Sequence, residues 1–340
     1  MKPVRVVLDA MGGDFAPKNE VQGAVAAVRT LGSRLQLTLV GREADLKAEL
    51  AAFPESGAIT IVHADDVVSM DDEPSSIVKQ RQSSSLYIGV ERMRSGAADA
   101  FVSAGNTGGV MATSTMLCGR IAGVSRPTIG SFLPTKTGRP CLVVDVGANV
   151  DSKARFLHDF AVMGSVYYRL MMGVERPSVG LLNVGEEPTK GREVVREAHG
   201  LLASANINFV GNVEGRDILS GNVDVVVCDG FEGNIVLKFA ESVLGFLKEK
   251  LRRYAAGGLV QKLAMAVVAP VLRSALRDMD YQEYGGVPLL GINGVTIIGH
   301  GSSSPKAIAN MIARAVDVVD RDVNGAISAA ITAPLKKETP

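Results

Sequence analysis

The chain has 340 residues, of which 46% are hydrophobic and 21% charged, a balance typical of a globular protein with a sizeable core. Lysine plus arginine number 36, as do aspartate plus glutamate, so the net charge is zero and gives no indication of nucleic-acid binding. The three cysteines, Cys118, Cys141 and Cys228, are too widely spaced for a disulfide framework or a cysteine-based zinc site.

The cysteines are expected to be reduced, which fits a cytoplasmic protein, and the start of the chain and its apolar runs predict that it does not span a membrane. A strand-like run begins at Val4, and no charged-then-apolar signal segment precedes it. The longest uninterrupted apolar run, residues 263–272, has about half the length that crosses a bilayer, and it contains Pro270. Contact with a membrane surface stays open.

Short runs of Val, Ile and Leu recur along the chain, and most of them lack the alternation of a half-exposed strand. They therefore predict strands that are covered on both faces, as in a mostly parallel sheet. These strands are expected at 4–8, 37–40, 59–62, 100–102, 142–146, 179–184, 208–210, 223–227 and 295–298. Helical spacing of apolar residues predicts helices at 21–31, 76–93, 156–172, 192–203, 235–254 and 305–319.

The alternation of strands and helices predicts a three-layer α/β/α fold that forms one domain over residues 1–340. The Pro- and Gly-richer stretch 126–140 is expected to be a loop between two halves.

Glycine-rich polar turns follow six of the predicted strands, at 9–14, 103–109, 145–149, 183–191, 228–234 and 299–303. One such turn would reflect only the freedom of glycine at positive φ. Ligands of parallel sheets bind where strands end, so six turns at one edge predict a polar pocket built from backbone amides. Helix N-termini in such a pocket favour an anion such as phosphate.

Common cofactor motifs are missing from these turns. The sequence contains neither a P-loop nor a Gly-x-Gly-x-x-Gly dinucleotide turn. The four histidines lie far apart and form no His-x-x-x-His pair, so we predict no cofactor and no bound metal, although a carboxylate-held Mg²⁺ stays open.

Five polar residues in the turns are candidates for chemistry, and each has a simpler structural interpretation. Lys190 could neutralise phosphate or an oxyanion, or it could be a surface lysine. His300, between two glycines, could protonate a leaving thiolate or only hydrogen-bond its own turn. Asn106 and Asn234 could cap helices, and Asp229 could orient a partner or cap a helix.

Taken together, the turns resemble the PlsX family of phosphate acyltransferases. The similarity rests on 8–14 with Pro17, 103–108, 145–149, 183–187 with 190–191, 229–231 with 233–234, 290–291 with 293–294, and 300–303. It extends from the first strand to the last helix. The chain departs from the family's usual residues at Gly109, Arg192 and Glu232, and the carboxylate of Glu232 is expected to point away from a bound anion.

The resemblance implies a fold similar to the phosphate acetyltransferase and isocitrate dehydrogenase-like fold. It implies transfer of a fatty acyl group from acyl carrier protein to inorganic phosphate, which makes acyl phosphate for phospholipid synthesis. It also implies a homodimer with the active cleft near the subunit interface. Peripheral contact with the cytoplasmic membrane would bring the product to a membrane glycerol-3-phosphate acyltransferase.

We expect direct attack by phosphate on the thioester in a ternary complex, without a covalent enzyme intermediate. The residues predicted to be catalytic are Lys190, His300, Asn234 and Asp229. Those predicted to bind substrate or phosphate are Asp9, Gly12, Gly13, Asp14, Gly105, Asn106, Thr107, Gly108, Asn149, Gly233, Ser302 and Ser303. Three alternatives stay open: a coenzyme A-dependent acetyl- or butyryl-type enzyme, a decarboxylating dehydrogenase, and a non-catalytic scaffold that binds carrier protein or lipid.

A protruding amphipathic helical segment is expected at about 257–280, interrupted near Pro270. Its basic residues fall on one side, and they are Lys262, Arg273 and Arg277. The apolar residues predicted to contact a membrane are Val260, Leu263, Val267 and Val271. An ordinary core or dimer helix is the alternative interpretation.

Overall fold

The computed structural model describes residues 2–275 and 285–332, with the side chains of Leu244 and residues 273–275 left out. In these ranges eleven strands form one sheet in the order β3-β2-β1-β4-β11-β10-β5-β6-β9-β7-β8. The strands are β1 Val4–Asp9, β2 Leu35–Gly41, β3 Ile59–His63, β4 Ala100–Ser103, β5 Thr128–Leu133, β6 Cys141–Val144, β7 Ser178–Leu182, β8 Asn208–Val213, β9 Val225–Val227, β10 Val287–Leu290 and β11 Val295–Ile298.

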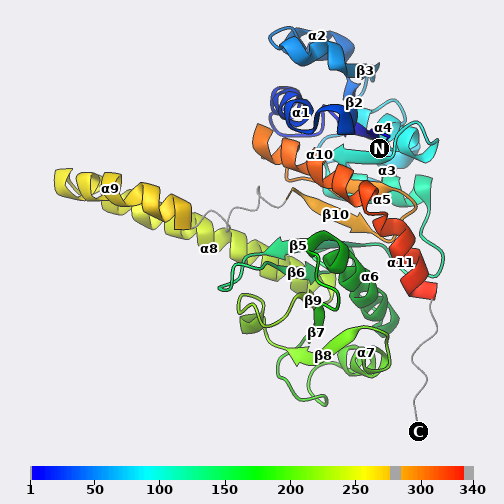
Figure 1. The fold of residues 1–340 in the computed structure, drawn as a ribbon, viewed down its shortest axis with the longest axis vertical. Coiled ribbons are helices and arrows are strands. Elements are labelled where there is room, and N and C mark those ends of the chain that lie inside the picture. The colour runs from blue at the N-terminus through cyan, green and yellow to red at the C-terminus, as the bar shows by residue number, and fades with distance from the viewer. Residues whose placement is uncertain (1, 276–284, 333–340) are drawn as a thin grey trace.

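Helices cover both faces of this sheet (Figure 1). They are α1 Lys18–Leu31, α2 Glu43–Leu50, α3 Pro74–Gln80, α4 Ser85–Arg94, α5 Thr107–Cys118, α6 Ala154–Met172, α7 Glu193–Ala203, α8 Gly230–Ala256, α9 Leu259–Ala275, α10 Pro305–Asp320 and α11 Val323–Thr332.

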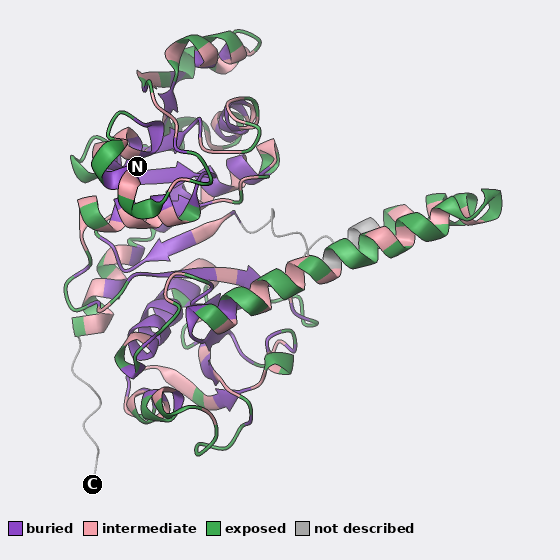
Figure 2. Ribbon diagram, turned by 180° about the vertical axis from the view of Figure 1, so that it is seen from behind, coloured by how far each residue is buried: buried purple, intermediate pink, exposed green. Residues whose placement is uncertain are grey.

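Burial of the strands on both faces confirms the predicted three-layer α/β/α fold. Val6 and Leu8 of β1 belong to a core cluster that also contains residues of α1, α6, α7, α10 and α11. Val7, between them, points into the other cluster, which contains residues of α3, α4 and α5 and is packed by α8. Neighbouring strand residues thus face opposite layers, so an uninterrupted apolar run is needed. In Figure 2 the strands are accordingly mostly buried.

The sheet consists of two parallel halves that run in opposite directions. Strands β3, β2, β1, β4 and β11 are parallel to one another, and so are β6, β9, β7 and β8. Between the halves, the β11–β10, β10–β5 and β5–β6 pairs are all antiparallel. Three reversals make β6 antiparallel to β11, so the expectation that all six turns leave one edge of the sheet is wrong.

The register nevertheless brings the strand ends of the two halves together. Pro288 of β10 pairs with Ile297 of β11, and Leu289 pairs with Ile129 of β5. The next residue of β5, Gly130, pairs with Val144, the last residue of β6. The carboxyl ends of β11 and β6 therefore lie in neighbouring rows of the sheet, on either side of β10 and β5.

Two predicted boundaries are corrected by local structure. The single helix expected at 76–93 is two helices, α3 and α4, because Ser84 caps α4 by accepting a hydrogen bond from the N–H of Tyr87 at 3.2 Å. The stretch 126–140 is not only a loop, since it contains β5. Its partner β10 was not predicted at all, because Pro288 in the second position of this strand lowered the strand signal.

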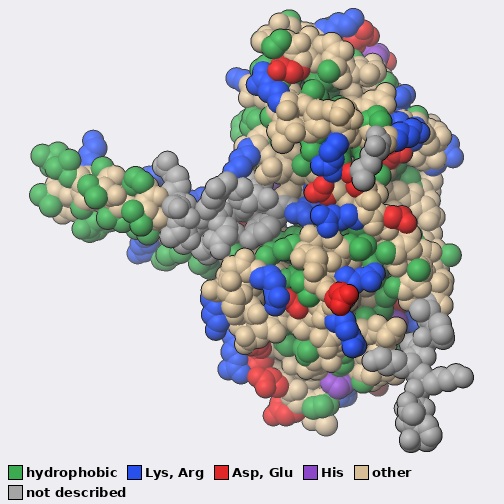
Figure 3. Space-filling view, in the orientation of Figure 1, with side chains coloured by type: hydrophobic (Ala, Val, Ile, Leu, Met, Phe, Trp, Pro, Cys, Tyr) green, Lys and Arg blue, Asp and Glu red, His purple; other side chains and the backbone are tan. Residues whose placement is uncertain are grey.

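Helices α8 and α9 form an arm that leaves the rest of the molecule (Figures 1 and 2). The described part of the predicted 257–280 segment is helical up to Ala275, whereas residues 276–280, including Arg277, lie outside the described residues. No helix in the described ranges is both long and apolar enough to cross a membrane. The outer end of the arm exposes hydrophobic side chains (Figure 3).

Candidate active site

A cavity of about 500 Å³ lies where the strand ends of the two halves meet. One side is formed by residues after β1, β4 and β11, and the opposite side by residues after β6 and in the first turns of α8. Strands β5 and β10 contribute residues between them. Five predicted site residues line this cavity, and they are Asp14, Gly105, Thr107, Asn234 and His300.

The turns after β1 and β4 pack directly on one another. The Ser103 hydroxyl donates to Asp9 Oδ2 at 2.8 Å and accepts from the N–H of Gly105 at 3.0 Å. A Cβ atom on Gly105 would lie 2.9 Å from the carbonyl oxygen of Gly12, and one on Gly12 would lie 2.5 Å from Asp9 Oδ2. Glycine is thus required here for close backbone approach, and buried Asp9 organises the turns rather than facing the cavity.

Carboxyl groups gather beneath the β1 turn. Burial raises the pKa of Asp9 above its usual range, and hydrogen bonds from Ser85 and Ser103 counteract this effect. Burial raises the pKa of Glu20 to about 7, with smaller contributions from the charges of Asp9 and Asp14. Below this pKa Glu20 is mostly neutral, which reduces the negative charge beside the β1 turn. The Glu20 side chain fills the space beside Gly13, because a Cβ on Gly13 would lie 2.1 Å from Glu20 Oε1.

The turn after β11 orients the imidazole of His300. The His300 Nδ1 atom lies 2.8 Å from the Ser302 hydroxyl and accepts from the Ser302 N–H at 3.2 Å. Acceptance at Nδ1 places the proton of the neutral ring on Nε2. Ser303 is buried, and its hydroxyl donates to the His300 carbonyl at 2.6 Å. The N–H of Asp14 donates to the Gly301 carbonyl at 2.8 Å, which fixes this turn to the β1 turn.

Asn106 is the N-cap of α5. Its Oδ1 accepts from the Gly109 N–H at 2.8 Å, and its Nδ2 donates to the carbonyls of Ser69, Met70 and Asp72. Both the oxygen and the nitrogen of the side-chain amide are therefore hydrogen-bonded to the protein. Within the described residues, the N–H groups of Thr107 and Gly108 in this first helical turn make no hydrogen bond, so they are available to an anion.

Asp229 has a similar structural role at the start of α8. Its Oδ1 accepts from the Phe231 N–H at 2.9 Å, and its Oδ2 accepts from the Ser152 N–H at 2.7 Å. The side chain is 5% exposed. Of the two interpretations given to Asp229, the structure therefore favours the helix cap that joins two segments.

The turn after β6 forms the support beneath α8. The carboxylate of Asp145 accepts from the N–H groups of Gly147, Ala148 and Asn149 and from the Asn149 side chain. Burial raises the pKa of Asp145 to about 6 in spite of these donors. The carbonyl of Asn149 accepts from the Gly230 N–H at 2.8 Å. Asn149 thus joins the turn to the helix and does not line the cavity.

Asn234 lines the cavity from the first turns of α8, where a Cβ on Gly147 would lie 3.5 Å from its side chain. In the described part of the chain its side-chain amide makes no hydrogen bond with protein atoms. Gly233 allows this position, because a Cβ there would lie only 1.8 Å from the carbonyl oxygen of Asp145.

Lys190 is exposed on the loop between β7 and α7 and does not line the cavity. Its carbonyl accepts from Asn183 Nδ2 at 3.0 Å. Two of the residues that depart from the family's usual pattern meet next to this loop, since Arg192 Nη2 lies 2.6 Å from Glu232 Oε1. The ion pair joins the loop to α8 and neutralises the carboxylate of Glu232.

Lys238 and Glu241 line the cavity but were missed in the sequence. They follow Asn234 by four and seven residues, so all three share one face of α8. The Lys238 ammonium lies 3.3 Å from Glu241 Oε2. The spacing from Asn234 was a signal that could have identified them, but α8 was expected to begin only at residue 235.

Comparisons with known proteins agree with this architecture. Residues 4–326 match the model of a family described as "Fatty acid synthesis protein". The chain is 44% identical to a phosphate acyltransferase from Nostoc sp. (strain PCC 7120) over 322 residues, which is 94% of each chain. It is 45% identical to a phosphate acyltransferase from Synechococcus sp. (strain JA-2-3B'a(2-13)) over 337 residues, 99% of this chain and 89% of that protein.

Among solved structures, a phosphotransacetylase from Streptococcus pyogenes matches with a TM-score of 0.64 at 17% identity, covering 94% of this chain and 95% of that one. At this identity the likeness concerns the fold, as the sequence led us to expect. The full-length similarity to curated relatives places the chain in the PlsX family of phosphate acyltransferases, which are transferase enzymes.

Proposed function

We propose that the protein transfers a fatty acyl group from acyl carrier protein to inorganic phosphate, which yields acyl phosphate and the free carrier thiol. The observation that carries the proposal is the cavity of about 500 Å³, which combines helix N-termini with His300, Asn234 and Lys238. Membership of the phosphate acyltransferase family supports the reaction class.

The proposed step needs no cofactor and no covalent enzyme intermediate. An oxygen of hydrogen phosphate attacks the thioester carbonyl carbon, so a C–O bond forms while the C–S bond breaks. The proton of hydrogen phosphate is lost, and the departing thiolate gains one. The protein must therefore hold both reactants, stabilise the oxyanion and move one proton.

The first turn of α5 is the proposed phosphate site. The N–H groups of Thr107 and Gly108 and the positive end of the helix dipole favour a dianion there. Lys238, which is ion-paired with Glu241, supplies an ammonium donor from the opposite side of the cavity. Lys190 would have to reach the anion from its exposed loop.

His300 is the proposed acid for the leaving sulfur. To act as the acid, the ring must be an imidazolium whose Nδ1–H donates to the Ser302 hydroxyl, 2.8 Å away. Its Nε2 then gives a proton to the departing thiolate and takes up the proton that hydrogen phosphate loses, so the ring returns to its charged form. Asn234, which lines the cavity, is the proposed donor to the carbonyl oxygen as that oxygen becomes an oxyanion.

A test of the reaction follows the products with and without phosphate. Purified protein and palmitoyl carrier protein should release thiol in step with acyl phosphate, and only when phosphate is present. Reaction with acyl coenzyme A but not with the carrier protein would favour the coenzyme A-dependent alternative. Binding of carrier protein or lipid without any reaction would favour the scaffold.

Lys190→Ala should lower turnover at least about tenfold if Lys190 binds phosphate or the oxyanion. Lys47→Ala, on exposed α2, is the matched control. Wild-type turnover of Lys190→Ala would remove Lys190 from the mechanism.

We also propose that the α8–α9 arm serves the homodimer and the cytoplasmic face of the membrane. Exposed Phe231, Ile235 and Phe239 on α8 are spaced by four residues and form an apolar stripe that a second copy could cover. On α9 the exposed apolar residues are Val260 (77% exposed), Leu263 (60%), Val267 (77%) and Val271 (67%). This arrangement supports contact with a bilayer surface. There the product would reach a membrane glycerol-3-phosphate acyltransferase, the partner that we propose.

Liposome flotation tests the membrane proposal. The Val267→Asp, Val271→Asp variant should lose lipid binding, because it places two charges in the apolar face of α9. Unchanged flotation would exclude this face as the membrane contact.

A further inference from the structure

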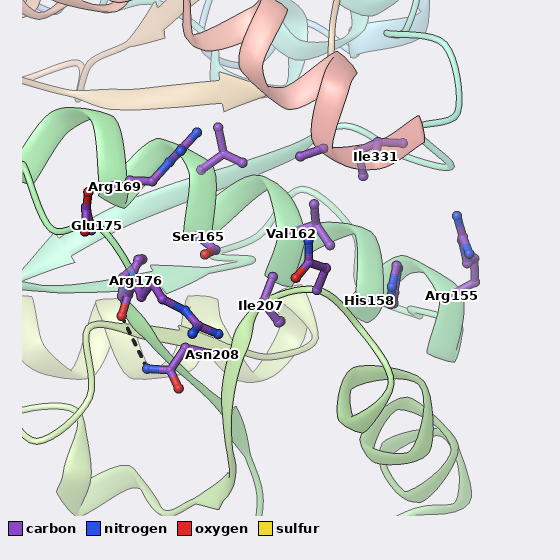
Figure 4. A pocket seen from close by; sticks show the side chains of 14 residues that line it. Arg155, His158, Val162, Ser165, Arg169, Glu175, Arg176, Ile207, Asn208 and Ile331 are labelled. Atoms are coloured by element: carbon purple, nitrogen blue, oxygen red, sulfur yellow. Dashed lines mark hydrogen bonds between the residues drawn. The ribbon is translucent and has the colours of Figure 1, made fainter. Parts of the chain in front are cut away.

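A second cavity, of about 290 Å³, lies away from the candidate active site (Figure 4). Its walls come from one face of α6, from the segments just before β7 and β8, and from the end of α11. These segments lead into the amino ends of β7 and β8, whereas the candidate active site uses turns after strand ends. The five residues of β7 separate the two edges by about 17 Å.

Arginine side chains dominate the charge of this cavity. Arg155, Arg169 and Arg176 line it, against a single carboxylate in the lining, that of Glu175. Arg155 is compensated, since its Nε lies 3.1 Å from an oxygen of buried Asp159. In the part of the chain that the structure describes, no carboxylate lies within ion-pair distance of Arg169 or Arg176.

The floor of the cavity is mostly apolar and contains one hydroxyl. Val162, Val166 and Ile207 line it together with Ile331 from α11. Ser165 is 9% exposed and lies on the same face of α6. Its hydroxyl makes no hydrogen bond with the described residues, which leaves a donor inside the cavity.

The Arg176 segment is held in place by the protein itself. Asn208 Nδ2 donates to the carbonyl oxygen of Arg176 at 3.3 Å, the contact drawn in Figure 4. Nearby, His158 Nδ1 lies 3.2 Å from Asp159 Oδ1, so the negative charge of Asp159 is shared between His158 and Arg155. Asp159 therefore does not neutralise the guanidinium groups at the other end of the cavity.

We propose that this cavity binds a small organic oxyanion that carries a short apolar chain. Arg169, Arg176 and Ser165 supply donors for a carboxylate or a phosphate monoester, and the valine and isoleucine side chains pack against its apolar part. A volume of about 290 Å³ holds roughly ten water-sized units. The ligand therefore has roughly ten non-hydrogen atoms, as octanoate and hexyl phosphate do.

The test measures direct binding by calorimetry, with octanoate, hexyl phosphate and inorganic phosphate as separate probes. The Arg169→Gln, Arg176→Gln variant should bind the two amphiphilic probes at least about tenfold more weakly, as loss of charge-assisted hydrogen bonds predicts. Both arginines are exposed, so folding should be unaffected. The Arg42→Gln, Arg94→Gln variant removes the same charge elsewhere and should bind like the wild type.

Lys238→Ala, in the candidate active site, identifies binding in that cavity instead. The proposal requires the binding that is lost in the Arg169→Gln, Arg176→Gln variant to survive in Lys238→Ala. The proposal is overturned if the wild type binds neither amphiphilic probe at millimolar concentration. It is also overturned if the Arg169→Gln, Arg176→Gln variant binds both amphiphilic probes as well as the wild type does. Equal affinity for inorganic phosphate and hexyl phosphate would overturn the apolar part of the proposed ligand. The relative affinity of octanoate and hexyl phosphate decides which oxyanion the cavity prefers.

Discussion

Replacing Glu20 with glutamine should change how the stability of this protein depends on pH. Glu20 is 1% exposed, and its Oε2 has no hydrogen-bond partner among the described residues. Burial raises its pKa from 4.5 to about 7, and the nearby charges of Asp9 and Asp14 act in the same direction. Glutamine has nearly the same shape as the neutral glutamic acid, but it cannot ionise.

The raised pKa means that the folded protein retains a proton that the unfolded chain has lost. The corresponding stability is fully present below the unfolded pKa of 4.5 and is lost as the pH rises through the folded pKa of about 7. At about 1.4 kcal/mol per pH unit, this interval corresponds to roughly 3 kcal/mol of unfolding free energy. For 340 residues, that free energy corresponds to a difference of roughly 4–5 °C in Tm.

Thermal unfolding of wild type and Glu20→Gln, recorded at about pH 4 and about pH 8, tests this reasoning. The Tm of the variant minus that of the wild type should be roughly 4 °C larger at the higher pH, because only the wild type is destabilised by ionisation of a buried group. The raised pKa of Asp145, which is not coupled to Glu20, affects both proteins alike. Glu197→Gln, on exposed α7, is the control and should show no such gain. An equal Tm difference at both pH values would refute the raised pKa of Glu20.

Three further predictions concern the candidate site. His300→Ala should lower kcat with acyl carrier protein by roughly a hundredfold, because the departing thiolate loses its acid. An unaltered kcat of this variant would exclude His300 as the acid. Gly233→Ala should destabilise the protein by at least about 2 kcal/mol in chemical denaturation, because the new Cβ would lie 1.8 Å from the Asp145 carbonyl oxygen; wild-type stability would contradict the packing described. A double-mutant cycle of Arg192→Asn and Glu232→Thr should give a coupling free energy below about 1 kcal/mol in stability, because the ion pair is exposed. The same cycle should show a measurable coupling in KM for phosphate, because the pair positions the loop between β7 and α7. Additive effects on KM would exclude this role.

Local sequence signals predicted most of the elements, because they depend on neighbours along the chain. The helix expected at 305–319 is α10 Pro305–Asp320, and the strand expected at 4–8 is β1 Val4–Asp9. Buried strands of Val, Ile and Leu and glycine-rich turns are recognisable without knowing their partners. The same signals identified residues that prove to line the cavity, among them Thr107, Asn234 and His300.

The roles of individual polar side chains were not determined in this way. A sequence shows that Asn106 and Asp229 can cap helices, but only the contacts show that capping uses their side-chain groups completely. Lys238 was missed because its helix begins earlier than its apolar periodicity indicated. Its place in the cavity depends on which face of α8 turns toward β5.

Residue order alone was enough to predict the class of fold, the glycine-rich turns after the strands and the family. Which of these turns meet depends on how distant strands pair. Three antiparallel pairings through β10 and β5 reverse one half of the sheet, and the register of Gly130 with Val144 then brings the strand ends of both halves to one cavity. The pairing that joins the halves is that of β10 with β5, two segments more than a hundred residues apart in the chain, and a local pattern of residues does not encode such a pairing.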